Sequence, residues 1–282
     1  MASISPAWFK EKLAPDGCVE DGCHPDEAQA LQEYIEGKTT AEQAAYTITR
    51  PVATSAEPGD NLHRLWGLLT DALVEWPSAE ETSALIQLMA AIEHLPEESH
   101  LTDRARASLH HGPPWNGLPG FGHQWSDEHK RGDWRRTISE QQQITTSERA
   151  ALRAKVVKIA SIEAQMVAAG VGGIPLDWGY ECISEALERS DAVLDFEIPM
   201  AAEWFKVAGR LIYEGAVHGE RSWALEKRQD LWKGQKEMSL VRWEFWEGRL
   251  QGLAEQNETR DAAEEALRAM QVAKKEYVNG VS

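Results

Sequence analysis

Carboxylates that alternate with large aromatic side chains are the residues of this sequence whose types could do chemistry. Glu181 follows Trp178 and Tyr180 in the segment LDWGYECI, and Glu203 precedes Trp204 in AAEWFKVAGRLIY. A carboxyl group held against an indole ring can have a raised pKa and act as a general acid. We therefore take Glu181 and Glu203 as candidate catalytic acids. The alternative is that both mark the polar side of an amphipathic helix.

Tryptophan is the unusual component of the composition, with 12 residues in 282. Trp243 and Trp246 are three residues apart and would share a helix face. Such aromatic residues could line a pocket for a small hydrophobic ligand, although large aromatic side chains also fill helical cores. The candidate ligand-binding residues are Trp178, Tyr180, Trp204, Trp243 and Trp246.

Three further groups have residue types that suit proton transfer or metal binding. His123 and Asp127 are four residues apart, which would place them on one helix face, so His123 is a further candidate catalytic residue. Asp191 and Asp195 could share a divalent cation. Cys18 and Cys23 lie close to His24, but no fourth zinc ligand follows at a recognisable spacing. We expect no metal site and no cofactor.

Composition and charge exclude several classes of function. The net charge of -17 disfavours nucleic acid and anionic membranes as partners. The local basic stretch of Lys130, Arg131, Arg135 and Arg136 is typical of a solvated helix end. Phosphate-binding loops, dinucleotide fingerprints and hydrolase motifs are missing. No apolar run is long enough to span a membrane. Lys10, Glu11 and Lys12 lie where a secretory signal would have its apolar stretch, so we expect a cytoplasmic protein.

Helix signals follow one another along the chain, and no run alternates as a strand would. We predict an all-α fold, an irregular multi-helix bundle of roughly nine to eleven helices, with no significant β-sheet. Proline residues and capping boxes set most of the expected boundaries. The expected helices cover residues 25–36, 41–50, 60–76, 79–95, 124–136, 145–169, 176–189, 199–214, 223–233, 239–254 and 258–277.

A segment rich in glycine and proline, residues 112–122, interrupts the helical pattern. Its composition predicts a loop, and Trp115, Leu118 and Phe121 would pin that loop to the helices. We therefore expect residues 1–282 to form a single all-helical domain, with a subdivision near this loop as the alternative. The sequence leaves open whether the loop is a lid or a fixed strut.

Five segments resemble, in the same order, the fungal domain-of-unknown-function family numbered 3632. The resemblance extends from about Tyr34 to Met270. It implies a helical, tryptophan-rich, cytosolic protein of fungal origin, and it implies no catalytic residue because no activity is established for that family. The segments are TTAEQAAYTITRPV, LWGLLTDALVEWP, LPGFGHQW, AAEWFKVAGRLIY and LVRWEFWEGRLQGLAE.

Three hypotheses of function follow. The first is a binding protein whose aromatic-lined pocket takes a small hydrophobic molecule or a partner segment. The second is an enzyme of fungal secondary metabolism, of the cyclase or isomerase type, in which an acid assists the reaction and aromatic rings stabilise a cation. The third is a structural or regulatory interaction protein. The oligomeric state stays open.

Overall fold

The computed structural model describes residues 4–55, 57–96, 115–130, 133–140, 144–227 and 229–280. All regular structure in these ranges is helical, which confirms the all-α prediction, and eleven of the helices have at least seven residues. The contacts of the chain group it into two compact units. Unit 1 contains residues 1–131 and 169–173, and unit 2 contains residues 132–168 and 174–282. The division falls after the Gly/Pro-rich loop, and the single-domain organisation stays a prediction.

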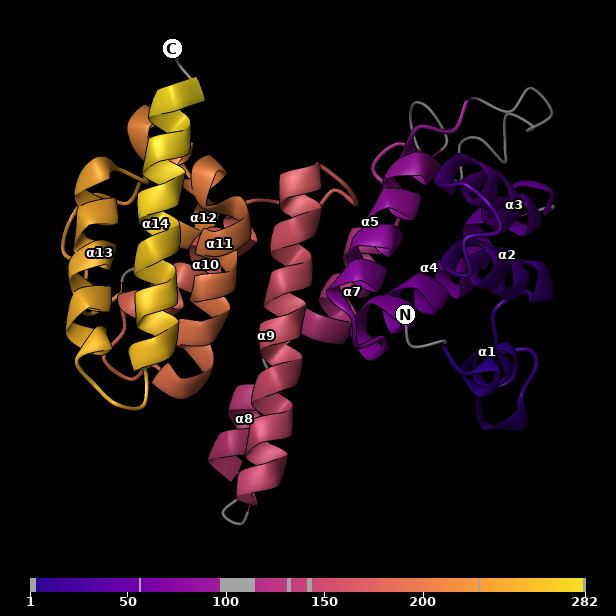
Figure 1. Cartoon of the computed structure of the whole chain (residues 1–282), viewed down its shortest axis with the longest axis horizontal. Coiled ribbons are helices and arrows are strands. Elements are labelled where there is room, and N and C mark those ends of the chain that lie inside the picture. Colours follow the sequence, from indigo (N-terminus) through magenta and orange to yellow (C-terminus); the bar gives the residue numbers. More distant parts are fainter. Residues whose placement is uncertain are drawn as a thin grey trace. The chain divides into compact units, whose positions relative to one another are not determined.

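Unit 1 is built on a group of helices (Figure 1). Alanine, leucine and tryptophan are among its buried side chains. Helix α3 packs against α2, α4 and α5, and α1 packs against α2. None of the described helices of the chain is both long and apolar enough to cross a membrane. The helices of unit 1 are α1 (Pro6–Leu13), α2 (Pro25–Ile35), α3 (Ala41–Ala53), α4 (Pro58–Glu75), α5 (Ala79–Glu93) and α7 (Phe121–Trp125).

Capping boxes fix the first turns of α2, α3 and α5 in unit 1, and the sequence pattern indicated boxes at the starts of α3 and α5 but not the one of His24 and Glu27 at α2. Ser78 and Glu81 cap α5, where the Ser78 hydroxyl accepts from the Glu81 amide at 3.1 Å and the Glu81 carboxylate accepts from the Ser78 amide at 3.3 Å. The expected end of α3 before Pro51 was wrong. The helix continues to Ala53, because a proline in the last turn removes one hydrogen bond without preventing those that follow it.

Residues 115–122 of the Gly/Pro-rich loop are fixed to unit 1 by aromatic contacts, while residues 112–114 lie outside the described ranges. Trp115, Leu118 and Phe121 are at most 1% exposed, which confirms that they pin the loop. The indole nitrogen of Trp66 on α4 donates to the carbonyl of Pro119 at 2.7 Å. The rings of Trp66 and Phe121 also pack edge to face, with their centroids 5.9 Å apart. This part of the loop is therefore a strut.

Unit 2 has its own core, formed where α11 packs along α14 and against α10. Helices α13 and α14 lie side by side (Figure 1). Gly179 lies on α10, where a Cβ atom would come within 2.6 Å of the Trp204 ring. The helices are α8 (Asp133–Glu140), α9 (Thr146–Ala169, of which Ala169 counts with unit 1), α10 (Asp177–Leu187), α11 (Leu194–His218), α12 (Trp223–Glu226), α13 (Leu240–Ala254) and α14 (Arg260–Gly280).

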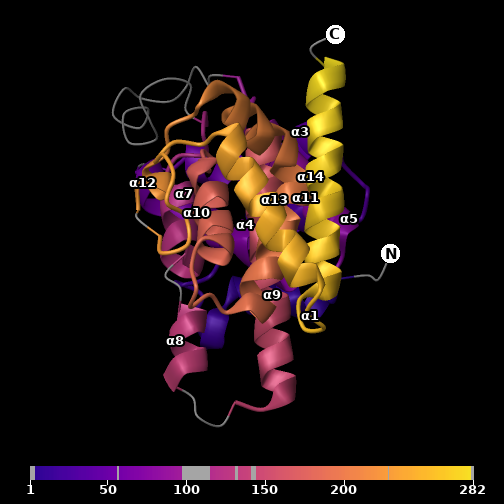
Figure 2. The same cartoon turned by 90° about the vertical axis from the view of Figure 1, so that its left-hand side faces the viewer.

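Helices α8 and α9 are tied to the first turn of α11 by arginine side chains. Arg135 on α8 donates to the carboxylates of Glu197, at 2.9 Å, and Glu185, at 2.7 Å. Arg149 on α9 donates to both carboxylate oxygens of Asp195, at 3.0 and 2.7 Å. Figure 2 shows α8 and the first half of α9 running antiparallel. The predicted solvated basic stretch therefore contains an arginine, Arg135, that forms partly buried ion pairs.

An ion pair buried in unit 2 joins the end of α10 to α13. Arg242 is 0% exposed and forms two bonds with the Glu188 carboxylate, at 2.6 and 2.7 Å. The Trp246 indole donates to the same carboxylate at 2.7 Å. The guanidinium also donates to the carbonyls of residues 235–237, at 3.3–3.4 Å. The helix expected over residues 223–233 ends at Glu226 instead, and the Leu231 amide donates to the carbonyl of Glu188 at 2.9 Å.

Replacing Arg242 with methionine is expected to lower the free energy of unfolding by about 3–5 kcal/mol, because the buried Glu188 carboxylate loses its cation. Urea unfolding followed by circular dichroism measures this change. The matched control is Arg268→Met on α14, where an exposed pair with Glu264 is lost and we expect less than about 1 kcal/mol. Equal effects of the two substitutions would contradict the assignment.

Candidate functional site

A cavity in unit 1 is the candidate binding site of the described structure. It has a volume of about 510 Å³ and lies between the N-terminal segment, α2 and α5. Its walls are largely apolar, and its polar groups come from α2, the turn after it and the first turns of α5. The lining residues are Ile4, Phe9, Gln32, Tyr34, Ile35, Glu36, Gly37, Thr39, Glu80, Glu81 and Ala84.

Tyr34 fixes the distance between two walls of this cavity. Its hydroxyl donates to the carbonyl of Ala84 at 2.9 Å and so joins α2 to α5. Burial of the phenol raises the pKa of Tyr34, and the nearby carboxylate of Glu42 raises it further. The phenol therefore stays neutral and keeps its hydrogen bond, so the cavity has one wall of fixed geometry.

The polar groups of the cavity are mainly carboxylates. Glu36 accepts a hydrogen bond from Gln32 at 2.9 Å and forms an ion pair with Lys38, which lowers the pKa of Glu36. Glu81 is held by the capping box of α5, and Glu80 is exposed beside it. None of the described lining residues is a lysine, arginine or histidine. A ligand here would meet an apolar wall and an acidic rim.

Thr39 also lines the cavity, and its hydroxyl is buried. It has no hydrogen-bond partner among the described residues. A buried polar group without a partner costs about 1–3 kcal/mol, which a partner that completes the hydrogen bond can recover. Among the buried polar side-chain atoms of the described part of the chain, the Thr39 hydroxyl is therefore the one on a lining residue that has no partner.

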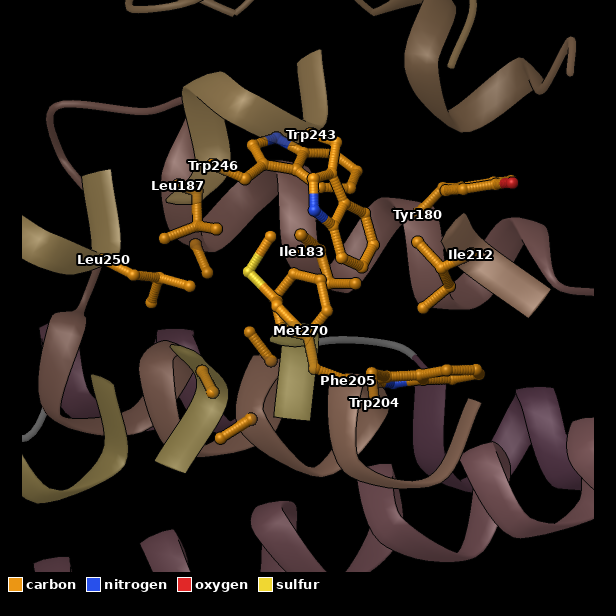
Figure 3. Packing of buried hydrophobic residues seen from close by; sticks show 14 of the residues in the cluster. Tyr180, Ile183, Leu187, Trp204, Phe205, Ile212, Trp243, Trp246, Leu250 and Met270 are labelled. Carbon is orange, nitrogen blue, oxygen red and sulfur yellow. The ribbon is translucent and has the colours of Figure 1, made fainter. Parts of the chain in front are cut away.

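The aromatic residues that the sequence offered as ligand-binding lie in the core of unit 2. Tyr180, Trp204 and Trp246 are 0% exposed, and Trp243 is 3% exposed. The ring centroid of Phe205 lies 5.6 Å from that of Trp243 and 6.1 Å from that of Trp246 (Figure 3). Trp178 is half-buried and packs on the same cluster. These side chains contact one another, so the structure assigns them a packing role, and a ligand pocket among them stays a prediction.

The candidate catalytic acids each have a positively charged neighbour in the structure. Glu181 on α10 forms an ion pair with Lys227 at 2.6 Å. Glu203 on α11 accepts from Ser161 at 2.7 Å and pairs with Lys206 at 2.5 Å. Exposed His123 belongs to unit 1, whereas both acids belong to unit 2. Their catalytic roles stay predictions, and each acid already has a cationic neighbour.

The residues considered as metal ligands have other partners. Asp191 binds Arg189 at 2.9 Å, and Asp195 binds Arg149. Burial raises the pKa of the Cys23 thiol to about 12, which disfavours the thiolate that a metal needs. In the ranges that the structure describes, no three histidine, cysteine or acidic side chains are grouped as metal ligands would be.

A buried carboxyl group, Glu27, was not identified from the sequence. It is 1% exposed and accepts from the backbone amide of His24 at 2.8 Å, as part of the capping box of α2. Burial raises the pKa of Glu27 from 4.5 to about 7, although the hydrogen bond and the charge of Arg64 oppose the rise. A glutamate two residues after Pro25 was the available signal, but the sequence does not show its burial.

Because Glu27 binds its proton more tightly in the folded state, the stability it contributes is complete below pH 4.5 and is lost as the pH rises through about 7. Glu27→Gln keeps the capping geometry and removes the titration. We expect the variant to gain stability relative to the parent between pH 4.5 and 8, on the order of 3 kcal/mol in total. Urea unfolding at several pH values in this range measures the free energy of unfolding of both proteins. The same pH dependence in the parent and the variant would contradict the raised pKa of Glu27.

Comparison with known proteins gives one family match. The sequence profile of a family described as "Protein of unknown function (DUF3632)" matches residues 66–250. No curated protein and no solved structure gives a match to the chain. The matched segment includes Glu188, Arg242 and Trp246, whereas eight of the eleven residues that line the cavity precede it.

Proposed function

Because the chain belongs to the DUF3632 family, whose description leaves its activity open, we propose a function from the cavity itself: unit 1 binds a small hydrophobic molecule. The site lies between the segment of Ile4 and Phe9, the C-terminal half of α2, and the first turns of α5. Most of its lining residues precede the family match, so the proposal concerns this chain and does not extend to the family.

The observation that carries this proposal is the combination of volume and lining. Ligand sites usually have volumes of about 300–1,000 Å³, apolar walls and a few placed polar groups. The cavity has a volume of about 510 Å³, and Phe9, Tyr34 and Ile35 contribute to its apolar wall. The hydrogen bond from Tyr34 to Ala84 supports a wall that is formed before a ligand arrives. Binding would then require little rearrangement of α2 and α5.

Binding of a neutral fluorescent probe, N-phenyl-1-naphthylamine, tests the proposal. We expect the full-length protein to bind it with a Kd in the micromolar range. Ala84→Phe places a phenyl ring in the cavity and is expected to weaken binding by about 10-fold or more, because the occupied volume excludes the probe. Fluorescence titration measures the affinity of both proteins.

The matched control is Ser83→Phe, which adds the same ring at an exposed position of the same helix. It is expected to leave the affinity for the probe unchanged. Circular dichroism and the thermal midpoint show whether each variant is folded. Equal affinity of Ala84→Phe and the parent protein would contradict a site in this cavity.

A further inference from the structure

We infer that the cavity of unit 1 selects an amphiphile with a cationic head group over one with an anionic head group. This inference rests on the proposed function and adds the chemical class of the ligand. It is drawn from the arrangement of charge around an apolar wall, and the wall itself would take the apolar tail of any amphiphile.

Glutamates supply all the charged groups among the described lining residues. Glu80 and Glu81 stand in the first turn of α5, and Glu36 follows α2 directly. Glu42, which acts on the pKa of the Tyr34 hydroxyl, adds a fourth carboxylate near the same wall. An anionic head group would therefore meet like charge at the rim, and such unfavourable pairs are a source of specificity.

Lys38 balances the negative charge of Glu36 but not the charges of Glu80 and Glu81. It forms its ion pair with Glu36 and lines a neighbouring cavity of about 370 Å³ instead of this one. Glu80 and Glu81 form no ion pair with a described residue, and one oxygen of Glu81 is used by the amide of Ser78. Carboxylate oxygens therefore remain as acceptors for an ammonium group whose tail lies against Phe9 and Ile35.

The buried hydroxyl of Thr39 provides an observation independent of charge. Its hydrogen bonding is incomplete within the described part of the chain, and Thr39 lines the same cavity. A hydroxyl both donates and accepts, so an ammonium, hydroxyl or carboxylate head group can complete its hydrogen bonding. Thr39 therefore supports a polar head group at this wall, and the preference for a cation rests on the glutamates.

Three ligands with the same ten-carbon tail test the inference on the full-length protein: decylammonium, decanol and decanoate, each below its micellar concentration at pH 7 and low salt. Isothermal titration calorimetry gives the three Kd values. We expect decylammonium to bind about 10-fold more tightly than decanoate, or about 1.4 kcal/mol, with decanol between them. Added salt should narrow the difference, because Glu80 is exposed.

The variant Glu80→Gln/Glu81→Gln removes the two unpaired charges and keeps the capping box, as Gln43 does in α3. We expect it to reduce the preference for decylammonium to about 2-fold or less while decanol binds as before. The control is Glu11→Gln/Glu20→Gln, which makes the same change of charge at exposed positions of unit 1 outside the cavity lining. It should keep the preference.

The outcomes separate this inference from the function on which it rests. Binding of decanol together with equal affinities for the two charged ligands would overturn the inference and leave the binding function standing. Retention of the full preference in Glu80→Gln/Glu81→Gln would also overturn it, because the selectivity would then arise elsewhere. Binding of none of the three ligands would overturn the proposed function and the inference together.

Discussion

The buried contact among Glu188, Arg242 and Trp246 is the constraint on which the arrangement of unit 2 depends. A carboxylate and a guanidinium that are both fully buried can be tolerated only if their hydrogen bonds are complete. The indole of Trp246 and the carbonyls of residues 235–237 complete them. One network thereby sets the end of α10, the position of α13 and the path of a segment that has little regular structure.

Tryptophan has a structural role in both units, and the partners of its indole nitrogen show how. Trp66 binds the backbone of the Gly/Pro-rich loop, and Trp246 binds the buried carboxylate. In each case a large apolar ring fills the core while its N–H satisfies a polar group that would otherwise be costly to bury. Packing and hydrogen bonding thus account for these two tryptophan residues, and the aromatic residues that line the cavity of unit 1 are Phe9 and Tyr34.

The fold was largely predictable because helix periodicity and capping boxes are local signals. The box of Ser78 and Glu81 marked the start of α5, and the apolar spacing marked α4. The site was not predictable, because its walls come from three segments that only the tertiary fold brings together. The sequence pattern of Trp243 and Trp246 did not indicate the cavity of unit 1, since a helix face of aromatic residues looks the same whether it packs or binds.

The close packing of Gly179 against Trp204 has an evolutionary consequence. A glycine inside a helix costs about 1 kcal/mol relative to alanine, yet here a Cβ atom would lie 2.6 Å from the ring. The two positions therefore cannot vary independently. Among descendants of this chain, a larger residue at position 179 could be fixed only after, or together with, a smaller one at position 204, so the pair should behave as a single inherited character.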